Sequence, residues 1–230
     1  MLIMGFQKMT LLDFPGRIAC TVFTGGCNLR CPFCHNALLV TEIDKSTAIP
    51  EEEVFSFLKK RGGLLDGVAI TGGEPLIQPD IKDFIKKVRD SGFAVKLDTN
   101  GCYPDKLKEI LDEKLVDYVA MDIKNSPERY AETVGVDNFD LAPIKESIAL
   151  LTSGDTEYEF RTTITKEFHT VKDVEGAAMM IKGAEKYFLQ NFVDSGNLIG
   201  KNLHACDADT LENMRSAAQK HVKTAVLRGI

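Results

Sequence analysis

The chain has 230 residues, of which 44% are hydrophobic and 27% charged, so it can bury the core of a single soluble globular domain spanning 1–230. Its net charge of -6 does not favour nucleic acid or an anionic membrane surface as a partner. No apolar stretch approaches the length of a membrane span, and no basic segment followed by an apolar one marks a signal peptide, so we expect a cytoplasmic protein that binds neither membrane nor nucleic acid.

Strands and helices are predicted to alternate along the chain. Apolar, β-branched runs predict strands at 18–23, 67–71, 93–101, 116–124, 157–165 and 186–193, with VKTAVLRG as a further candidate. Amphipathic stripes predict helices at 50–61, 79–92, 104–114, 171–185 and 207–221, and in SPERYAETVG and PIKESIALLTSG. In the second of these helices Ile81, Phe84, Ile85 and Val88 share one face, and Gly92 closes it.

About six β–α units in succession are typical of an α/β fold, a parallel sheet with helices outside it. A doubly wound sheet and a partial barrel both fit this order, and the pattern alone does not separate them. In either fold, polar residues that follow the strands gather at the carboxyl ends of the strands.

Three of the six cysteines, Cys27, Cys31 and Cys34, lie in GCNLRCPFCHN with the spacing Cys-x3-Cys-x2-Cys and no fourth cysteine in phase. A structural zinc site needs four ligands, so it would require His35, which is badly placed next to Cys34, or a distant residue. Three cysteines in one loop do not fit a secreted disulfide framework. An iron–sulfur cluster bound by three thiolates keeps one iron open, so the spacing favours a cluster that does chemistry.

Polar motifs follow three of the predicted strands. TGGEP has two glycines that let a ligand approach the backbone, and Glu74 as an acceptor for an ammonium, although alone it is also compatible with a simple glycine turn. LDTNG and MDIKN add Asp98, Asp122 and Lys124. Together these side chains could bind a zwitterion or place a monovalent cation between two carboxylates, whereas an Asn-Gly turn and a strand ion pair are the structural alternatives.

The cysteine loop, with Phe33 directly before Cys34, resembles the radical S-adenosylmethionine (SAM) superfamily, and the neighbouring GGEP segment strengthens the resemblance. In that superfamily the three cysteines bind a 4Fe-4S cluster whose open iron is chelated by the methionine part of SAM. The resemblance favours a partial, open six-stranded (β/α) barrel. It assigns Cys27, Cys31 and Cys34 to the cluster.

LDTNG and MDIK narrow the resemblance to the activating enzymes of glycyl radical enzymes, including the pyruvate formate-lyase activator. That family implies cofactor contacts from Phe33, Gly72, Gly73, Glu74, Asp98, Asp122 and Lys124. It also implies a monovalent-cation site at Asp98, Thr99 and Asp122. Arg161 matches an arginine of the family, and its alternative role is a salt bridge that closes the barrel. The N-terminal LLDFPG followed by the cysteine loop resembles the branch that activates anaerobic ribonucleotide reductases.

At some positions the chain departs from the pattern of the family that it resembles. Val193 stands where the pyruvate formate-lyase activator has a histidine that touches the cofactor, and polar neighbours would have to replace it: Asp194, Ser195 or Asn197. Cys20 is expected in the core and Cys102 near the barrel mouth, whereas His204 and Cys206 are interpreted as loop residues rather than a metal or redox pair.

The resemblance therefore predicts an enzyme that takes an electron from flavodoxin or ferredoxin, cleaves SAM to a 5′-deoxyadenosyl radical, and installs a glycyl radical on a partner, an anaerobic ribonucleoside-triphosphate reductase. One alternative is a radical enzyme with a small substrate, similar to 7-carboxy-7-deazaguanine synthase. The other is a non-catalytic iron–sulfur protein, in which a fourth thiolate would be expected.

Overall fold

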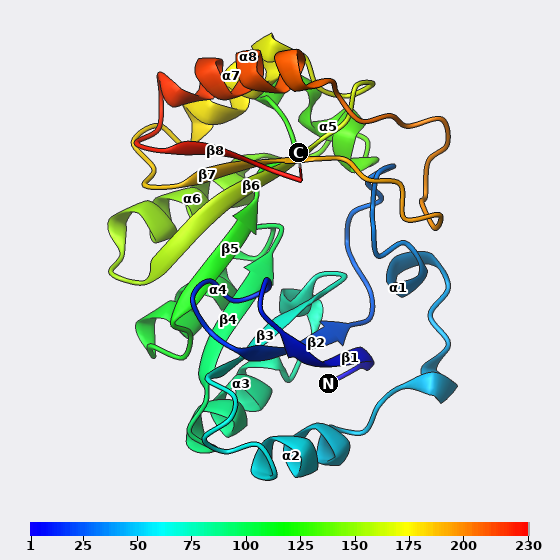
Figure 1. Ribbon diagram of the computed structural model, residues 1–230, viewed down its shortest axis with the longest axis vertical. Helices are drawn as coiled ribbons and strands as arrows, with labels where there is room; N and C mark the ends of the chain where they lie inside the picture. The colour runs from blue at the N-terminus through cyan, green and yellow to red at the C-terminus, as the bar shows by residue number, and fades with distance from the viewer. Residues whose placement is uncertain (230) are drawn as a thin grey trace. The chain divides into compact units, whose positions relative to one another are not determined.

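The computed structural model describes residues 1–229 (Figure 1). The strands follow one another in the sheet in chain order, and this order does not close on itself, so the fold is α/β with an open sheet, as predicted. The strands are β1 (Ile3–Thr10), β2 (Ala19–Thr24), β3 (Gly67–Gly72), β4 (Ala94–Thr99), β5 (Tyr118–Asp122), β6 (Glu157–Ile164), β7 (Tyr187–Asn191) and β8 (Ala225–Arg228).

The six predicted strands correspond to β2–β7, with ends that differ by one or two residues, and VKTAVLRG contains β8. Strand β1 was not predicted. The helices are α1 (Leu38–Thr41), α2 (Glu51–Lys59), α3 (Ile81–Asp90), α4 (Pro104–Asp112), α5 (Tyr130–Val134), α6 (Ala142–Ser153), α7 (Val171–Met180) and α8 (Ala208–Gln219). Each predicted helix is present, but α7 ends at Met180, five residues before the predicted end, and the short α1 is additional. No helix within 1–229 is both long enough and apolar enough to span a membrane.

Contacts divide the chain into two compact units. Unit 1 comprises Met1–Asn28, Leu38–Val119 and Asp155–Glu157, and unit 2 comprises Leu29–Ala37, Ala120–Gly154 and Tyr158–Ile230. Whether 1–230 behaves as the single domain that the sequence predicts stays a prediction.

In unit 1, β1 pairs antiparallel with β2, whereas β2, β3 and β4 are parallel. The parallel register aligns Thr21 with Ala69 and Ala69 with Lys96, so these three residues form a row across the sheet. Helix α3 buries the apolar stripe that the sequence predicted, and Gly92 after it has a φ of 88°, a conformation that glycine adopts without strain.

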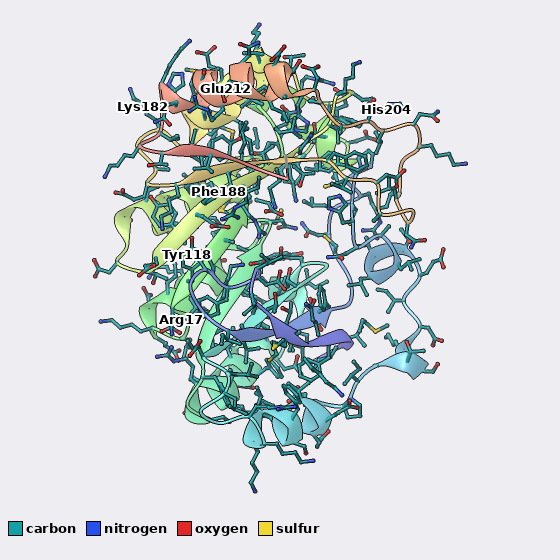
Figure 2. All side chains as sticks on the ribbon, viewed as in Figure 1. Arg17, Tyr118, Lys182, Phe188, His204 and Glu212 are labelled. Atoms are coloured by element: carbon teal, nitrogen blue, oxygen red, sulfur yellow. The ribbon has the colours of Figure 1, made fainter. Side chains whose placement is uncertain are left out.

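The LLDFPG segment closes the amino end of the parallel strands in unit 1. Phe14 is 2% exposed and packs with Ala19 and Tyr118, whose ring centroid lies 6.4 Å from that of Phe14 (Tyr118 is labelled in Figure 2). The carboxylate of Asp13 accepts a 2.6 Å hydrogen bond from the hydroxyl of Thr21 on β2. Within this unit the motif therefore packs at the opposite strand ends from the TGGEP segment.

In unit 2, β6, β7 and β8 are parallel, and α7 packs against α8. Glu159 is 1% exposed, and the guanidinium of Arg228 binds both of its carboxylate oxygens, at 2.9 and 3.0 Å. The same guanidinium lies 3.3 Å from the ring centroid of Phe188 on β7 (Phe188 is labelled in Figure 2). This pairing ties β8 to β6, because a buried carboxylate needs a partner of opposite charge.

Candidate active site

The cysteine loop begins where β2 ends, with Cys27 in unit 1 and Cys31 and Cys34 in unit 2. All three are free thiols, so the donors for a three-thiolate cluster are present. Taken one at a time over residues 1–229, neither unit contains a group of three or more His, Cys, Asp and Glu side chains that could hold a metal ion. A cluster on the three cysteines is therefore a proposal that rests on the thiols and on their spacing.

Backbone contacts in unit 2 hold the second half of the loop. The N–H of Arg30 donates to the carbonyl of Val134 at 2.8 Å, and that of Gly200 donates to the carbonyl of Pro32 at 2.7 Å. Gly135 has a φ of 63°, and a Cβ there would lie 2.6 Å from the carbonyl oxygen of Arg30. Only glycine therefore lets α5 end against the loop.

His35 joins the cysteine loop to the residues that follow β7. Its Nε2 lies 2.9 Å from the carbonyl oxygen of Val193, and its ring stacks on Phe192 at 5.7 Å. A carbonyl can only accept, so Nε2 carries the proton and donates it. In this tautomer Nδ1, and not Nε2, has the lone pair that could bind a metal.

Phe33 is 3% exposed and lies against the rings of Phe168 and His169, at 5.9 and 5.8 Å. Burial raises the pKa of the adjacent Cys34 thiol, and the charge of Lys124 partly opposes this rise. A metal ion would overcome the remaining cost, since it binds the thiolate form.

The TGGEP segment is hydrogen-bonded to the start of the cysteine loop within unit 1. The N–H of Gly73 donates to Thr24 O at 2.9 Å, and that of Glu74 donates to Gly26 O at 2.8 Å. Gly72 has a φ of 120°, and a Cβ on Gly73 would lie 1.9 Å from Gly26 O. Both glycines are therefore required by close backbone approach, which is more than an ordinary turn demands.

Glu74 is fully buried, and its carboxylate joins β3 to the end of β4. Oε1 accepts from the N–H of Leu76 at 3.0 Å and from the hydroxyl of Thr99 at 2.8 Å, and Oε2 accepts from the N–H of Asn100 at 2.7 Å. These donors use at least three of the roughly four lone-pair sites of a carboxylate. Glu74 therefore has a structural role, and its role as ammonium acceptor stays a prediction.

Asn100 connects this carboxylate to a cluster cysteine. Its side-chain amide donates to Asn28 Oδ1 at 2.8 Å and lies 3.8 Å from the Sγ of Cys27, while its own oxygen accepts from the N–H of Cys102 at 3.0 Å. The side chain is therefore a donor to the thiol rather than only a turn former.

Two other predicted residues end β4. Asp98 is paired with Lys96, whose side chain is only 3% exposed. The hydroxyl of Thr99, besides donating to Glu74, accepts from the N–H of Gly101 at 3.1 Å.

Asp122, Lys124 and Arg161 meet in unit 2, whereas the sequence predicted only that Asp122 and Lys124 point the same way. Asp122 accepts from Lys124 Nζ at 2.8 Å and from Arg161 Nε at 2.9 Å, through different oxygens. Burial alone would raise the pKa of Asp122, but the two cations outweigh it and hold this pKa well below its usual range. Burial would lower the pKa of Lys124, but Asp122 and the thiol of Cys31 raise it above its usual value. The three groups are therefore charged and have one net positive charge.

His169 contacts the backbone of this group of charged residues at Lys124. Its Nδ1 accepts from the N–H of Thr165 at 3.1 Å, so its Nε2 donates to the carbonyl of Lys124 at 2.9 Å. Burial lowers the pKa of His169, which keeps the ring neutral. The ring thus fixes the backbone at Lys124 and packs against Phe33.

Residues 21–165 match the family model of the radical SAM superfamily. The chain belongs to the radical SAM superfamily. Membership implies a 4Fe-4S cluster and SAM, and it makes the protein a radical SAM enzyme rather than a non-catalytic iron–sulfur protein.

Relatives within the radical SAM superfamily include activating enzymes. The chain is 30% identical over 236 residues to a protein of Methanocaldococcus jannaschii provisionally named a glycyl-radical enzyme activating enzyme, and this alignment covers 100% of the chain and 96% of the relative. It is 28% identical over 158 residues to the 7-carboxy-7-deazaguanine synthase of Clostridium acetobutylicum, covering 68% of the chain and 70% of the synthase.

Among solved structures, Streptococcus suis SuiB bound to its precursor peptide SuiA gives a TM-score of 0.69 at 16% identity. This match covers 91% of the chain and 48% of SuiB. At this identity it supports the radical SAM fold alone.

The predicted cofactor residues fall into two sets, one in each unit. Those of unit 1 are Gly72, Gly73, Glu74, Asp98 and Thr99, and those of unit 2 are Phe33, Asp122, Lys124 and Arg161. In unit 1 Glu74 joins its own segment to Thr99, and in unit 2 Asp122 joins Lys124 to Arg161. Their contacts with the radical SAM cofactor remain proposals.

In the part of the region after β7 that the structure describes, His204 and Cys206 contact other residues and not each other. His204, labelled in Figure 2, pairs through Nδ1 with Glu167 at 2.8 Å on the surface, whereas Cys206 is 7% exposed and its N–H donates to Asn191. Val193 is 63% exposed, and its carbonyl accepts from His35. The contacts of His204 and Cys206 are consistent with the interpretation of both as loop residues.

Sequence reasoning did not find Asn100, His169 or Lys96. Lys96 had a usable signal, because a lysine two residues before an aspartate shares its face of a strand. Asn100 and His169 had none, since an Asn-Gly pair predicts a turn and an isolated histidine predicts nothing specific.

Proposed function

We propose that this radical SAM enzyme cleaves SAM and installs a glycyl radical on an anaerobic ribonucleoside-triphosphate reductase. The observation that carries the activating function is the alignment of the whole chain with a relative named for that activity. The choice of partner rests on LLDFPG followed by the cysteine loop, which resembles the branch that activates these reductases.

When bound, the reduced cluster supplies one electron that splits SAM into methionine and a 5′-deoxyadenosyl radical, which takes a hydrogen atom from a glycine Cα and leaves as 5′-deoxyadenosine. Cys27, Cys31 and Cys34 would hold the cluster. Flavodoxin or ferredoxin would supply the electron.

In unit 2 the one net positive charge of Asp122, Lys124 and Arg161 suits the carboxylate of the methionine part of SAM. Lys124 has three N–H donors, and the contact with Asp122 takes one of them. Asp122 fixes the direction of both cations, so it would position Lys124 rather than bind the cofactor itself. His169 holds the backbone from which Lys124 projects.

In unit 1 the two glycines of TGGEP keep side chains out of the strand end, so a ligand would meet backbone groups there. We propose that Glu74 accepts the methionine ammonium. Because it is held by three protein donors, it would do so without moving, which limits the entropy lost on binding.

The test mixes anaerobically reconstituted protein with the reductase, SAM and a reductant, and records electron paramagnetic resonance spectra. A doublet should form, and it should disappear when the target glycine of the reductase is replaced by alanine. Cys31→Ala is the matched control on this chain, since it removes one cluster ligand. Formation of 5′-deoxyadenosine without a protein radical would show that the partner is wrong while the radical chemistry stands.

A second candidate is a radical SAM enzyme with a small substrate, because the chain is also similar to a 7-carboxy-7-deazaguanine synthase over 68% of its length. Incubation with a pterin, the kind of substrate that the resemblance implies for that class, separates the two. Turnover of the pterin without any radical on the reductase would favour this candidate.

A further inference from the structure

Lys96 is a buried lysine beside the proposed cofactor residues of unit 1. It lies on β4, two residues before Asp98, so both side chains project from the same face of the strand. Its ammonium pairs with Asp98 Oδ1, and the side chains are 3% and 16% exposed. A lysine is rarely buried so completely without a charged partner.

The neighbouring strand makes room for this lysine. Ala69 on β3 is its partner in the parallel register, and Thr21 follows on β2. The small side chain of Ala69 leaves space for the four-carbon stem of Lys96. The ion pair between Lys96 and Asp98 is therefore part of the packing of the sheet and not a surface contact.

The oxygens that the resemblance assigns to a monovalent cation already have protein partners. Asp98 is neutralised by Lys96, and the Thr99 hydroxyl lies between Glu74 and the N–H of Gly101. Each oxygen of Asp122 accepts from a cationic side chain, as described for unit 2. A bound Na⁺ or K⁺ would add a positive charge to groups that protein cations already balance.

We propose that the ammonium of Lys96 supplies the positive charge that the resemblance assigns to a monovalent cation, so that this protein binds its cofactor without Na⁺ or K⁺. The proposal rests on the proposed function only in that SAM binds at these strand ends. It makes no use of the partner.

The first test compares the wild-type protein, loaded with its cluster, in potassium chloride and in tetramethylammonium chloride of equal ionic strength, because equal ionic strength keeps charge screening constant. Calorimetry should give SAM dissociation constants that agree within about twofold. A fivefold or greater tightening in potassium or sodium would overturn the proposal, whatever the variants do.

The second test uses Lys96→Met, with Lys108→Met as matched control, since Lys108 pairs with Asp112 on the exposed face of α4. Without Lys96 the Asp98 carboxylate loses its ammonium partner, and we expect SAM to bind at least fivefold more weakly in tetramethylammonium, with the affinity restored in potassium. Wild-type affinity for SAM in tetramethylammonium would overturn the role of Lys96.

A third readout needs neither cluster nor SAM, so it separates this proposal from the proposed function. Potassium at 10 times its dissociation constant should shift the folding equilibrium of the cluster-free Lys96→Met variant about elevenfold toward the folded state and raise its melting temperature. The melting temperature of the cluster-free wild type should not change. If Lys96→Met does not fold in either salt, Lys96→Met/Asp98→Asn, which removes both charges, replaces it. That double variant should bind SAM equally in both salts, and a potassium dependence would contradict the proposal.

Discussion

Replacing Asn100 by aspartate tests whether its side chain acts on the cluster. The substitution keeps the oxygen that accepts from the N–H of Cys102 and replaces the amide nitrogen, 3.8 Å from the Sγ of Cys27, by a charged oxygen. A donor to the thiolate is thus exchanged for a negative charge. Because reduction adds an electron to the cluster, we expect the midpoint potential to fall.

The size of the fall follows from the distance. With an effective dielectric constant of about 20, a unit charge 3.8 Å from an electron on Sγ costs about 4 kcal/mol. The electron is shared over the cluster, mostly farther away, so about 1.5–3 kcal/mol is expected, which is about 65–130 mV for one electron. Asn100→Ala, which only loses the donor, should lower the potential by about 20–65 mV.

The assay is a redox titration of the reconstituted cluster without SAM, followed by electron paramagnetic resonance. Asn138→Asp is the control, since it makes the same chemical change at an exposed position. Iron content must be equal in all samples. A midpoint for Asn100→Asp within about 20 mV of wild type, which is a twofold change in the ratio of the two redox states, would refute the reasoning.

Three further predictions concern single residues. Lys124→Ala should weaken SAM binding by about 1.5–3 kcal/mol, the scale of a charged hydrogen bond, and unchanged affinity by calorimetry would reject its cofactor role. Gly73→Ala should lower the melting temperature even without iron, because its Cβ would lie 1.9 Å from Gly26 O; an unchanged melting temperature would contradict the close approach. His169 is buried with a lowered pKa, so below its unfolded value of 6.5 the unfolded chain binds a proton that the folded chain does not. As the pH is lowered below 6.5, the free energy of unfolding should therefore decrease by up to about 1.4 kcal/mol per pH unit. Melting curves of His169→Gln between pH 7.5 and 5 should not show this decrease.

The sequence predicted the strands β2–β7 because each is a compact apolar run that ends in a recognisable motif. It missed β1, whose residues are mostly half-buried or exposed and show no clean alternation. That Asp122 and Lys124 lie together could be predicted, since residues two apart share a face of a strand, whereas their meeting with Arg161 on β6 was not predicted. The bonds of Asn100 to the side chain of Asn28 and to Cys27 could not, because they join residues more than 70 positions apart and leave no local pattern.

The LLDFPG motif packs against residues of its own unit. The sequence resemblance used it to choose a partner, but the described contacts of Asp13 and Phe14 are with Thr21, Ala19 and Tyr118 of unit 1 itself. Its contribution to partner choice therefore remains a prediction. The first two residues of the motif, Leu11 and Leu12, are 67% and 91% exposed.

The bonds between the TGGEP segment and the start of the cysteine loop have a consequence for how the enzyme is assembled. Gly73 donates to Thr24, Glu74 donates to Gly26, and Gly26 donates to Leu39, so all three bonds join backbone atoms of the protein. Small zinc fingers fold only when metal arrives, because their ligands have no other scaffold. Here the scaffold around Cys27 is held by its own backbone, so the polypeptide can be completed first and receive iron afterwards from a donor protein. Amide hydrogens of Gly73 and Glu74 should accordingly exchange slowly with solvent before any iron is supplied.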